Sequence, residues 1–216
     1  MNLGFFHSKV PQISAIKPQK KKKNRFNIYL DGKFVFGLPA EILVKENLSV
    51  GRELSSREIN NLIFKNRLGK SLDRVYHFLS YRPRSEREVW DYLKKKEVDR
   101  KVAGKVINKL EKLGYIDDLE FTRWWVEQRS IFRPRGKRAL MMELWQKGVE
   151  QEVIDQVLDE LVDETVLAKK AVKKKIVTWQ KLPWRERRRK LSDYLARRGF
   201  SWEAIKEIVD DSSING

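Results

Sequence analysis

The sequence predicts a mainly α-helical protein made of tandem three-helix repeats, preceded by a small module of strands and short helices. Two observations support this prediction. Apolar residues after residue 69 of the 216-residue chain recur at a spacing of 51 residues. Before residue 69, aromatic and β-branched residues alternate with polar ones around an Asp-Gly pair, which is typical of a tight hairpin. Serial repeats gain stability by packing on their neighbours, so we expect an elongated, curved array.

Three strands are expected in the first module, over residues 12–17, 25–30 and 33–37. The Asp31-Gly32 pair separates the last two strands, and both of its positions can adopt positive φ. The third strand is expected because an isolated hairpin is only marginally stable in water. We therefore expect a β-hairpin in this module, with residues 12–17 as a candidate third strand beside it.

Two helices follow the strands. Pro39 opens a short helix that runs to about Asn47, because proline at the first helical position loses no hydrogen bond. Ser55, with Glu58 three residues later, has the pattern of a capping box and starts a second helix. We assign the module to residues 1–68.

The rest of the chain repeats itself in its apolar and turn residues. Four sets of apolar positions follow the step of 51 residues: Leu93, Leu144 and Leu195; Val89, Leu140 and Leu191; Val98, Val149 and Phe200; Val106, Val157 and Ile208. Arg-Pro-Arg-Ser at 82–85 matches Arg-Pro-Arg-Gly at 133–136, whereas Arg185 stands where the third copy would have proline. We assign the three repeats to residues 69–115, 116–162 and 163–216.

Each repeat is predicted to contain three helices, which in the first copy cover residues 71–80 and 85–96 and continue from Asp99. Pro83 ends the first helix, since the residue before a proline avoids the helical region. Ser85 and Glu88 form another capping-box pattern at the start of the second helix. The Asp163–Thr165 stretch is a candidate hinge between the second and third repeats.

The turn after the second helix distinguishes the first copy from the others. It contains Glu97 in the first copy and Gly148 or Gly199 in the other two. Glycine is the residue that a helix C-terminus prefers at this position.

The chain carries a net charge of +17, and the charge is uneven. The net charge is +8 over residues 1–68, +3 over 69–162 and +6 over 163–216. A one-sided excess of charge repels itself, and either a nucleic acid or an acidic protein surface would relieve that repulsion. The composition therefore predicts an anionic partner and leaves these two classes open.

Several function classes are disfavoured by what the sequence lacks. It contains no cysteine and only two histidines, His7 and His77, and it has no phosphate-binding loop. The Asp117-Asp118 pair could support metal binding or acid–base chemistry, but a helix N-cap is the expected role. We therefore expect no enzyme, no cofactor and no metal.

The sequence also lacks the patterns of membrane insertion. No apolar stretch is long enough for a transmembrane helix, and residues 1–10 contain no apolar run of the length of a secretory signal. We expect a soluble, cytoplasmic protein that does not bind membranes.

Basic clusters are the candidate binding residues. The Arg-Pro-Arg pairs stand at the start of the second helix of a repeat, where free N–H groups and the helix dipole attract anions. A solvated helix face is the alternative interpretation of the clusters in the repeats, and a mobile loop is the alternative for the run at 20–23. The candidate residues for contact with a partner or DNA are Lys20, Lys21, Lys22, Lys23, Arg82, Arg84, Arg133, Arg135, Lys137, Arg138, Lys173, Lys174, Lys175, Arg185, Arg187, Arg188 and Arg189.

Tryptophans accompany these clusters. Trp124 and Trp125 are adjacent, so one is expected in the core while the other could stack on a base or anchor a partner. Trp179, Trp184 and Trp202 flank the basic third repeat. Basic and aromatic residues in alternation are typical of single-strand binding, although core packing explains lone tryptophans equally well.

Several motifs together resemble the RecX regulatory proteins. They are Arg-Pro-Arg-Ser at 82–85, Lys-Lys-Lys-x-Val at 94–98, Lys-Leu-Gly-Tyr-Ile-Asp-Asp at 112–118 followed by Phe121, Trp125 and Val126, Arg-Pro-Arg-Gly at 133–136, and Gln-Lys-Gly-Val at 146–149. The hairpin at 27–32 is similar to the amino-terminal extension of some members. The resemblance covers residues from about 12 to 210 and is weaker in the third copy.

The resemblance implies a tandem array of three-helix units that inhibits or modulates the RecA recombinase. Family members bind in the groove of the RecA–DNA filament, bridge neighbouring protomers, and suppress ATP hydrolysis, strand exchange and co-protease activity. The resemblance thus implies a role in DNA repair, recombination and the SOS response, with the RecA filament and single-stranded, and also double-stranded, DNA as partners. We expect a monomer, although the sequence leaves the oligomeric state open. An independent DNA-binding protein is the alternative. Glu97 and the Trp184-Arg185 pair depart from the family pattern.

Overall fold

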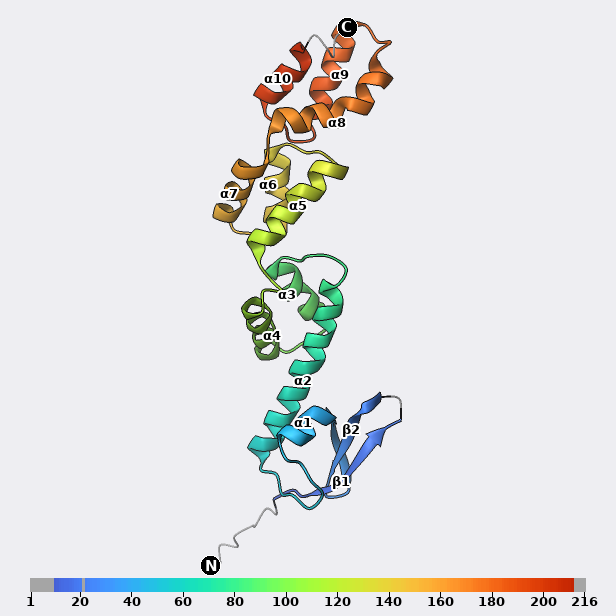
Figure 1. The fold of residues 1–216 in the computed structure, drawn as a ribbon, viewed down its shortest axis with the longest axis vertical. Coiled ribbons are helices and arrows are strands. Elements are labelled where there is room, and N and C mark those ends of the chain that lie inside the picture. The colour runs from blue at the N-terminus through green and yellow to red at the C-terminus, as the bar shows by residue number, and fades with distance from the viewer. Residues whose placement is uncertain (1–9, 21, 212–216) are drawn as a thin grey trace, which may run out of the picture. The chain divides into compact units, whose positions relative to one another are not determined.

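The computed structural model describes residues 10–20 and 22–211, with the side chains of Lys22 and Lys23 left out. The described residues form three strands and ten helices (Figure 1). They divide into two compact units. One contains the residues up to 76 together with 98–106, and the other contains 77–97 together with the residues from 107 onward.

The first module contains the expected three-stranded antiparallel sheet. Its strands are β1 (Ile13–Gln19), β2 (Lys22–Leu30) and β3 (Lys33–Pro39), in the order β1-β2-β3. The turn between β2 and β3 has positive φ at Asp31 (48°) and Gly32 (83°), so the predicted hairpin is confirmed.

One face of the sheet packs against helices to form a small core. The helices are α1 (Ala40–Lys45), whose N-cap is Pro39, and the start of α2 (Ser56–Leu79). Apolar side chains from both layers share one cluster whose most buried members are Ile13, Ile28, Leu38 and Leu54. The predicted capping box is present, because the Ser55 N–H donates to Glu58 Oε2 (2.9 Å) and the Glu58 N–H to Ser55 Oγ (3.3 Å).

Helix α2 corrects the predicted break between the first module and the first repeat. The two helices expected there are one continuous helix of 24 residues. Gly69 alone does not stop a helix, since glycine costs only about 1 kcal/mol relative to alanine. The buried Asn66 also accepts a hydrogen bond from Arg25 Nη2 (2.6 Å), which fixes the middle of the helix on the sheet. The boundary placed between residues 68 and 69 therefore lies inside a helix, and the domain limits stay a prediction.

The remaining helices form the predicted tandem repeats. They are α3 (Glu86–Lys95) and α4 (Arg100–Lys112), then α5 (Asp118–Phe132), α6 (Lys137–Gln146) and α7 (Gln151–Leu161), then α8 (Glu164–Trp179), α9 (Trp184–Ala196) and α10 (Trp202–Asp210). Leu93, Leu144 and Leu195 occupy the same place in α3, α6 and α9, and all three are fully buried. The 51-residue step therefore marks equivalent core positions.

The turns after these helices also match. Gly148 and Gly199 have φ of 81° and 79°, and Glu97 has φ of 54° at the equivalent position. The first repeat thus places a non-glycine residue in the left-handed region that its two copies fill with glycine. In the third repeat the helix starts about one turn early, with Pro183 as the N-cap of α9.

The second and third repeats share one continuous hydrophobic core. Phe121 of α5, Leu140 of α6 and Leu191 of α9 are buried in the same cluster. At the junction the Gly136 N–H donates to the Arg198 carbonyl (3.1 Å). A Cβ atom at Gly136 would overlap the backbone of the Gly199–Phe200 turn, so only glycine permits this approach.

The stretch expected to act as a hinge is hydrogen bonded on several sides, and its role as a hinge stays a prediction. Asp163 is the N-cap of α8 and accepts from the Val166 N–H (3.0 Å). Glu164 accepts from the Lys137 N–H (2.8 Å), and Thr165 Oγ1 donates to Glu207 (2.8 Å). These bonds connect the start of α8 to α6 and α10.

We predict that Gly136→Ala destabilises the protein by about 2–4 kcal/mol, because the added methyl group must separate two backbones in a close-packed junction. Urea denaturation followed by circular dichroism measures the change. Gly69→Ala is the matched control. Its Cβ atom meets nothing within 4 Å in helix α2, so it should be neutral or stabilise by up to about 1 kcal/mol. Equal stability of the two variants would contradict the close approach.

Candidate interaction surfaces

The first Arg-Pro-Arg pair is engaged within the protein. Arg82 makes a bidentate ion pair with Glu88 of α3, through Nη2 to Oε1 (2.8 Å) and Nη1 to Oε2 (3.0 Å). Lys147, from the turn after α6, also reaches Glu88 Oε1 (2.8 Å). Arg84 lies 4.0 Å from the same carboxylate and 4.0 Å from the centre of the Phe78 ring. One glutamate thus holds three cations at the junction of the first and second repeats.

This arrangement modifies the predicted capping box of α3. Ser85 Oγ accepts from the Glu88 N–H (3.2 Å) as expected, and it donates to the Lys147 carbonyl (2.7 Å). The Glu88 carboxylate makes no return bond to the cap, because Arg82 and Lys147 occupy it. The Ser85 hydroxyl therefore caps α3 as predicted, whereas the Glu88 carboxylate connects the first repeat to Lys147 of the second.

The pKa values of this cluster follow from its charges. Burial would raise the pKa of Glu88, but the hydrogen bonds and charges of Arg82 and Lys147 outweigh burial and hold it below its ordinary value. Burial, with the neighbouring charge of Arg82, lowers the pKa of Arg84. Glu88 is therefore the stabilising anion of the cluster.

The adjacent tryptophans lie beside this cluster. The prediction of one core and one free ring needs correction, because both Trp124 and Trp125 are partly buried against the core of the second and third repeats. Lys147 and Arg129 lie over the Trp125 ring, 4.4 and 4.5 Å from its centre. Trp125 Nε1 donates to Glu143 (2.9 Å). Trp125 is thus enclosed by cations and a carboxylate and offers little surface for a base.

The second Arg-Pro-Arg pair is divided. Arg135 pairs with Glu143 (2.9 Å), which also receives Arg129 Nε (2.7 Å). Arg133 is exposed at the C-terminal end of α5. The two arginines that look equivalent in sequence therefore differ in availability, and Arg133 is the one that a partner can reach.

The paired aspartates have structural roles. Asp117 is the N-cap of α5 and accepts from two N–H groups, as expected. Asp118 Oδ1 accepts from the Glu86 N–H at the start of α3 (2.9 Å). Burial, together with nearby carboxylates that include Glu150, raises the pKa of Asp118 despite that hydrogen bond. Within residues 10–20 and 22–211, no group of three or more potential metal ligands occurs.

A basic cleft of about 500 Å³ lies between the end of α5, the following turn, α8 and α9. The residues that line the basic cleft are Ile131, Phe132, Arg133, Pro134, Lys170, Ala171, Lys173, Lys174, Lys175, Thr178, Tyr194 and Arg198. Six of them are cationic and none is acidic. Within the part of the chain that the structure describes, the cleft can therefore attract an anion without competition from its own lining.

Helix α8 exposes its lysines because its other face is buried. One face of α8 packs into the core through Leu167, Ala168, Ala171 and Val172. The opposite face of the helix therefore points away from the core. Lys170, Lys173 and Lys174 are exposed as a result. Among the described residues these three lysines have no carboxylate within ion-pair distance, in contrast to Arg82 and Arg135.

The other candidates fall into two groups. Arg138, Arg185 and Arg189 are exposed. Lys137 pairs with Asp159 (2.6 Å) and Arg188 with Asp210 (3.1 Å).

Arg187 is only 6% exposed, so it is removed from the set of surface contacts; it lies on the face of α9 that packs inward. Lys20 is exposed in the turn before β2, and the strand begins at Lys22, within the run. Lys21 lies outside the described residues.

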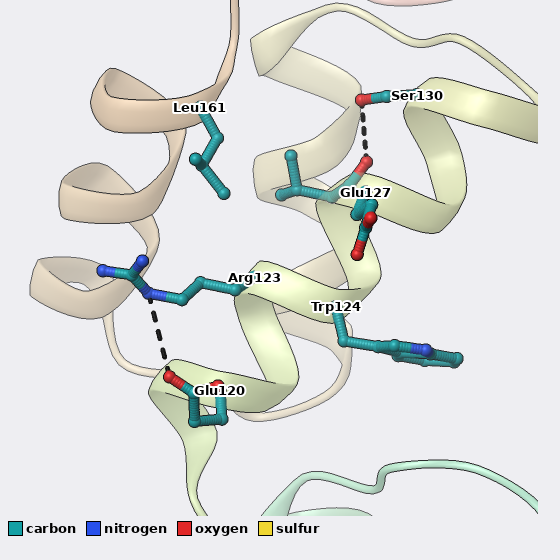
Figure 2. A pocket seen from close by; sticks show the side chains of 7 residues that line it. Glu120, Arg123, Trp124, Glu127, Ser130 and Leu161 are labelled. Atoms are coloured by element: carbon teal, nitrogen blue, oxygen red, sulfur yellow. Dashed lines mark hydrogen bonds and ion pairs between the residues drawn. The ribbon is translucent and has the colours of Figure 1, made fainter.

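A second hollow of about 470 Å³ lies beside α5 (Figure 2). Figure 2 shows Arg123 reaching toward the helix that carries Leu161, while Trp124 extends in another direction. Arg123 is bonded to Glu160 (2.8 Å) and lies 4.0 Å from Glu120. Its charge is thus used within the protein, so this hollow is a weaker binding candidate than the basic cleft.

Four family models match successive parts of the chain. They are the regulatory protein RecX N-terminal domain at residues 11–55, and the first, second and third three-helix domains of RecX at 72–110, 117–158 and 163–209. The chain belongs to the RecX family. It is 36% identical to regulatory protein RecX of Bacillus subtilis over 93% of this chain and 77% of the relative, and 35% identical to that of Bacillus velezensis over 94% and 78%.

Solved structures of RecX proteins share the fold. A crystal structure of regulatory protein RecX matches 93% of this chain and all of that chain, with a TM-score of 0.72 and 29% identity. The structure of RecX from Lactobacillus salivarius matches 70% of this chain and 98% of that chain, with a TM-score of 0.61 and 22% identity. The tandem three-helix architecture is therefore a property of the RecX fold.

Sequence reasoning missed several residues of these RecX surfaces. The spacing from Ser85 predicts only a capping role for Glu88, and no motif singles out Glu143, although both carboxylates neutralise arginines. Phe132 and Arg198 line the basic cleft, although neither is among the candidate residues predicted from the sequence. No local signal distinguishes them, because their position depends on how α5, α8 and α9 pack.

We predict that Glu88→Gln destabilises the protein by about 1.5–3 kcal/mol at pH 7, since charge-assisted hydrogen bonds to Arg82 and Lys147 are lost. The pKa of Glu88 is lowered by folding, so its contribution is present above the unfolded pKa near 4.5 and disappears as pH falls through the folded value. Urea denaturation between pH 3 and 7 should show the two proteins converging at low pH. Glu203→Gln, at an exposed residue, should change little.

Asp118 should behave in the opposite way. Its pKa is raised by folding, so stability falls as pH rises from the unfolded pKa near 3.8 through the folded value. Asp118→Asn keeps an oxygen for the Glu86 N–H and removes the buried charge. We expect a higher melting temperature than the parent at pH 7 and a smaller difference at pH 4, measured by calorimetry. A lower melting temperature at pH 7 would contradict the burial cost.

Proposed function

We propose that this chain is a non-catalytic regulator that binds the RecA–DNA filament and inhibits or modulates recombinase, ATPase and co-protease activities. The membership of the RecX family supports this proposal most directly, because the relatives carry the name of a regulatory protein. The role would belong to DNA repair, recombination and the SOS response, in the cytoplasm and as a monomer.

The exposed, unpaired cations of the repeats support the proposal that the chain binds an anionic partner. Glu88 and Glu143 neutralise the arginines at the junctions, whereas Arg133, Lys173 and Lys174 stay exposed and without a described ion pair. A filament presents phosphate and protein surfaces side by side. Several weak contacts on one chain give a combined affinity greater than any single contact.

The carboxylates support a role without catalysis. Asp117 and Asp118, the acid pair considered for chemistry, both accept hydrogen bonds from helix N-termini. Each group therefore has a structural task that explains its position.

Among the described residues no helix has the length and apolarity to cross a bilayer.

Independent binding of single- or double-stranded DNA is the second candidate function. The basic cleft favours it, because six cations surround a hollow that no acidic side chain lines. Under this alternative the effects on a filament would follow from competition for DNA.

We expect substoichiometric amounts of this protein to inhibit RecA ATP hydrolysis on saturating single-stranded DNA, measured by a coupled assay. Inhibition that persists when DNA is in excess supports filament binding, and inhibition that excess DNA abolishes supports simple competition. Inhibition absent under both conditions would contradict the proposed function.

Charge reversal tests the exposed residues of the second repeat. Arg133→Glu with Arg138→Glu should weaken inhibition at least about tenfold if each contact contributes about 0.7 kcal/mol or more. Arg135 is left intact, because its reversal would place a second carboxylate beside Glu143. Lys105→Glu with Lys109→Glu on α4 is the matched control and should inhibit like the parent.

A further inference from the structure

We propose that the basic cleft binds the phosphate backbone of single-stranded nucleic acid, and that Phe132 stacks on one of its bases. This assignment deepens the proposed function, since a RecA filament contains such a strand. It concerns the site itself and can be tested without RecA.

The charge of the basic cleft identifies an anion as its ligand. Its six cations come from three segments that are distant in sequence: Arg133 after α5, four lysines of α8, and Arg198 after α9. Salt bridges occupy most of the junction arginines, but among the described residues no carboxylate lies within ion-pair distance of Arg133, Lys170, Lys173 or Lys174. Gathering unpaired like charges costs free energy, which a polyanion would recover by counterion release.

The lysines of α8 form a row that suits a chain of phosphates. Lys173 and Lys174 follow Lys170 by three and four residues, so both lie on the same face of the helix as Lys170. The helical rise places the first and last about 6 Å apart along the axis. A row of point charges favours a ligand whose charges are also repeated, such as a nucleic-acid backbone.

Two further cations of the basic cleft, Arg198 after α9 and Lys175 of α8, are held in place by neighbouring groups. Arg198 Nη1 donates to the Pro134 carbonyl (3.2 Å), and its guanidinium lies 4.6 Å from the centre of the Tyr194 ring. Lys175 lies 5.9 Å from the same ring, and Tyr194 itself donates to the Ala171 carbonyl (3.2 Å). Side chains that are already ordered lose less conformational entropy when a ligand binds.

Phe132 distinguishes a nucleic acid from an acidic protein segment. It is the last residue of α5, lines the basic cleft and is 74% exposed, and the neighbouring Ile131 is 60% exposed. An exposed aromatic ring beside cations is the arrangement in which bases of a single strand stack, because every base has a π-face. An acidic peptide would use the cations without the ring, and a duplex keeps its base faces covered. Single-stranded nucleic acid therefore fits all the lining groups.

The test measures binding of the full chain to a fluorescein-labelled oligo-dT by anisotropy, over a series of salt concentrations and without RecA. The triple variant Lys170→Ala, Lys173→Ala, Lys174→Ala should bind less tightly, and its plot of log affinity against log salt should be shallower by about 2, since each lost phosphate contact on a single strand removes about 0.7. Phe132→Ala should weaken binding about 5- to 100-fold with an unchanged salt slope. Phe132→Trp should restore the affinity.

A matched control separates the cleft from general charge. Lys101→Ala, Lys105→Ala, Lys109→Ala removes three exposed lysines from one helix, α4. This variant should keep the parental salt slope. Circular dichroism of all variants should match the parent, because the substituted side chains are exposed. An equal loss in the control would show diffuse attraction and overturn the proposal.

Two further outcomes would also overturn the assignment. One is an affinity of the α8 triple variant within twofold of the parent. The other is an affinity for a poly-glutamate peptide equal to that for oligo-dT together with no effect of Phe132→Ala, which would assign the cleft to an acidic protein segment. The ATPase assay is independent of these results, so loss of the cleft assignment and loss of the RecA role give different patterns.

Discussion

The repeats depend on one physical constraint: the N-terminus of a second helix is buried against the next repeat, and its free N–H groups need acceptors there. Asp118 supplies the acceptor for α3 and Glu164 the acceptor for α6. Each carboxylate comes from the first turn of the following repeat. The N-terminus of the second helix of one repeat is thus hydrogen bonded to the first turn of the next repeat. We call this contact a joint: successive repeats are held together there by hydrogen bonds as well as by apolar packing.

The same joints decide which charges remain available. Glu88 holds Arg82 and Lys147 across the first joint, and Glu143 holds Arg129 and Arg135 beside Trp125. These half-buried ion pairs remove cations from the surface that the composition alone assigns to it. Among the described residues, exposed cations without a carboxylate partner are therefore concentrated along α8 and at the basic cleft.

The fold and the binding surface are linked through packing on α8. This helix buries Leu167, Ala168, Ala171 and Val172 in the core of the second and third repeats. Its lysines must then face outward, beside the end of α5 and the turn after α9. The proposed contact with a RecA–DNA filament is consistent with such a surface, because the helices present exposed cations without the need for an enclosed reaction site.

The sequence by itself determined the three-stranded sheet, the repeat positions and the caps. These features depend on local patterns: positive φ at Asp31 and Gly32, the spacing of Leu93, Leu144 and Leu195, and Asp117 before α5. It also carried the family resemblance, since the turn motifs lie in short contiguous runs.

Only the tertiary structure decided which basic residues are accessible. Arg133 and Arg135 look alike in sequence, yet Arg135 meets Glu143 from another helix while Arg133 faces solvent. The unbroken helix α2 and the buried Arg187 likewise follow from packing partners. Whether a basic side chain is free to bind a partner depends on whether folding places a carboxylate from a distant segment beside it. No local sequence pattern encodes the distance between two such groups.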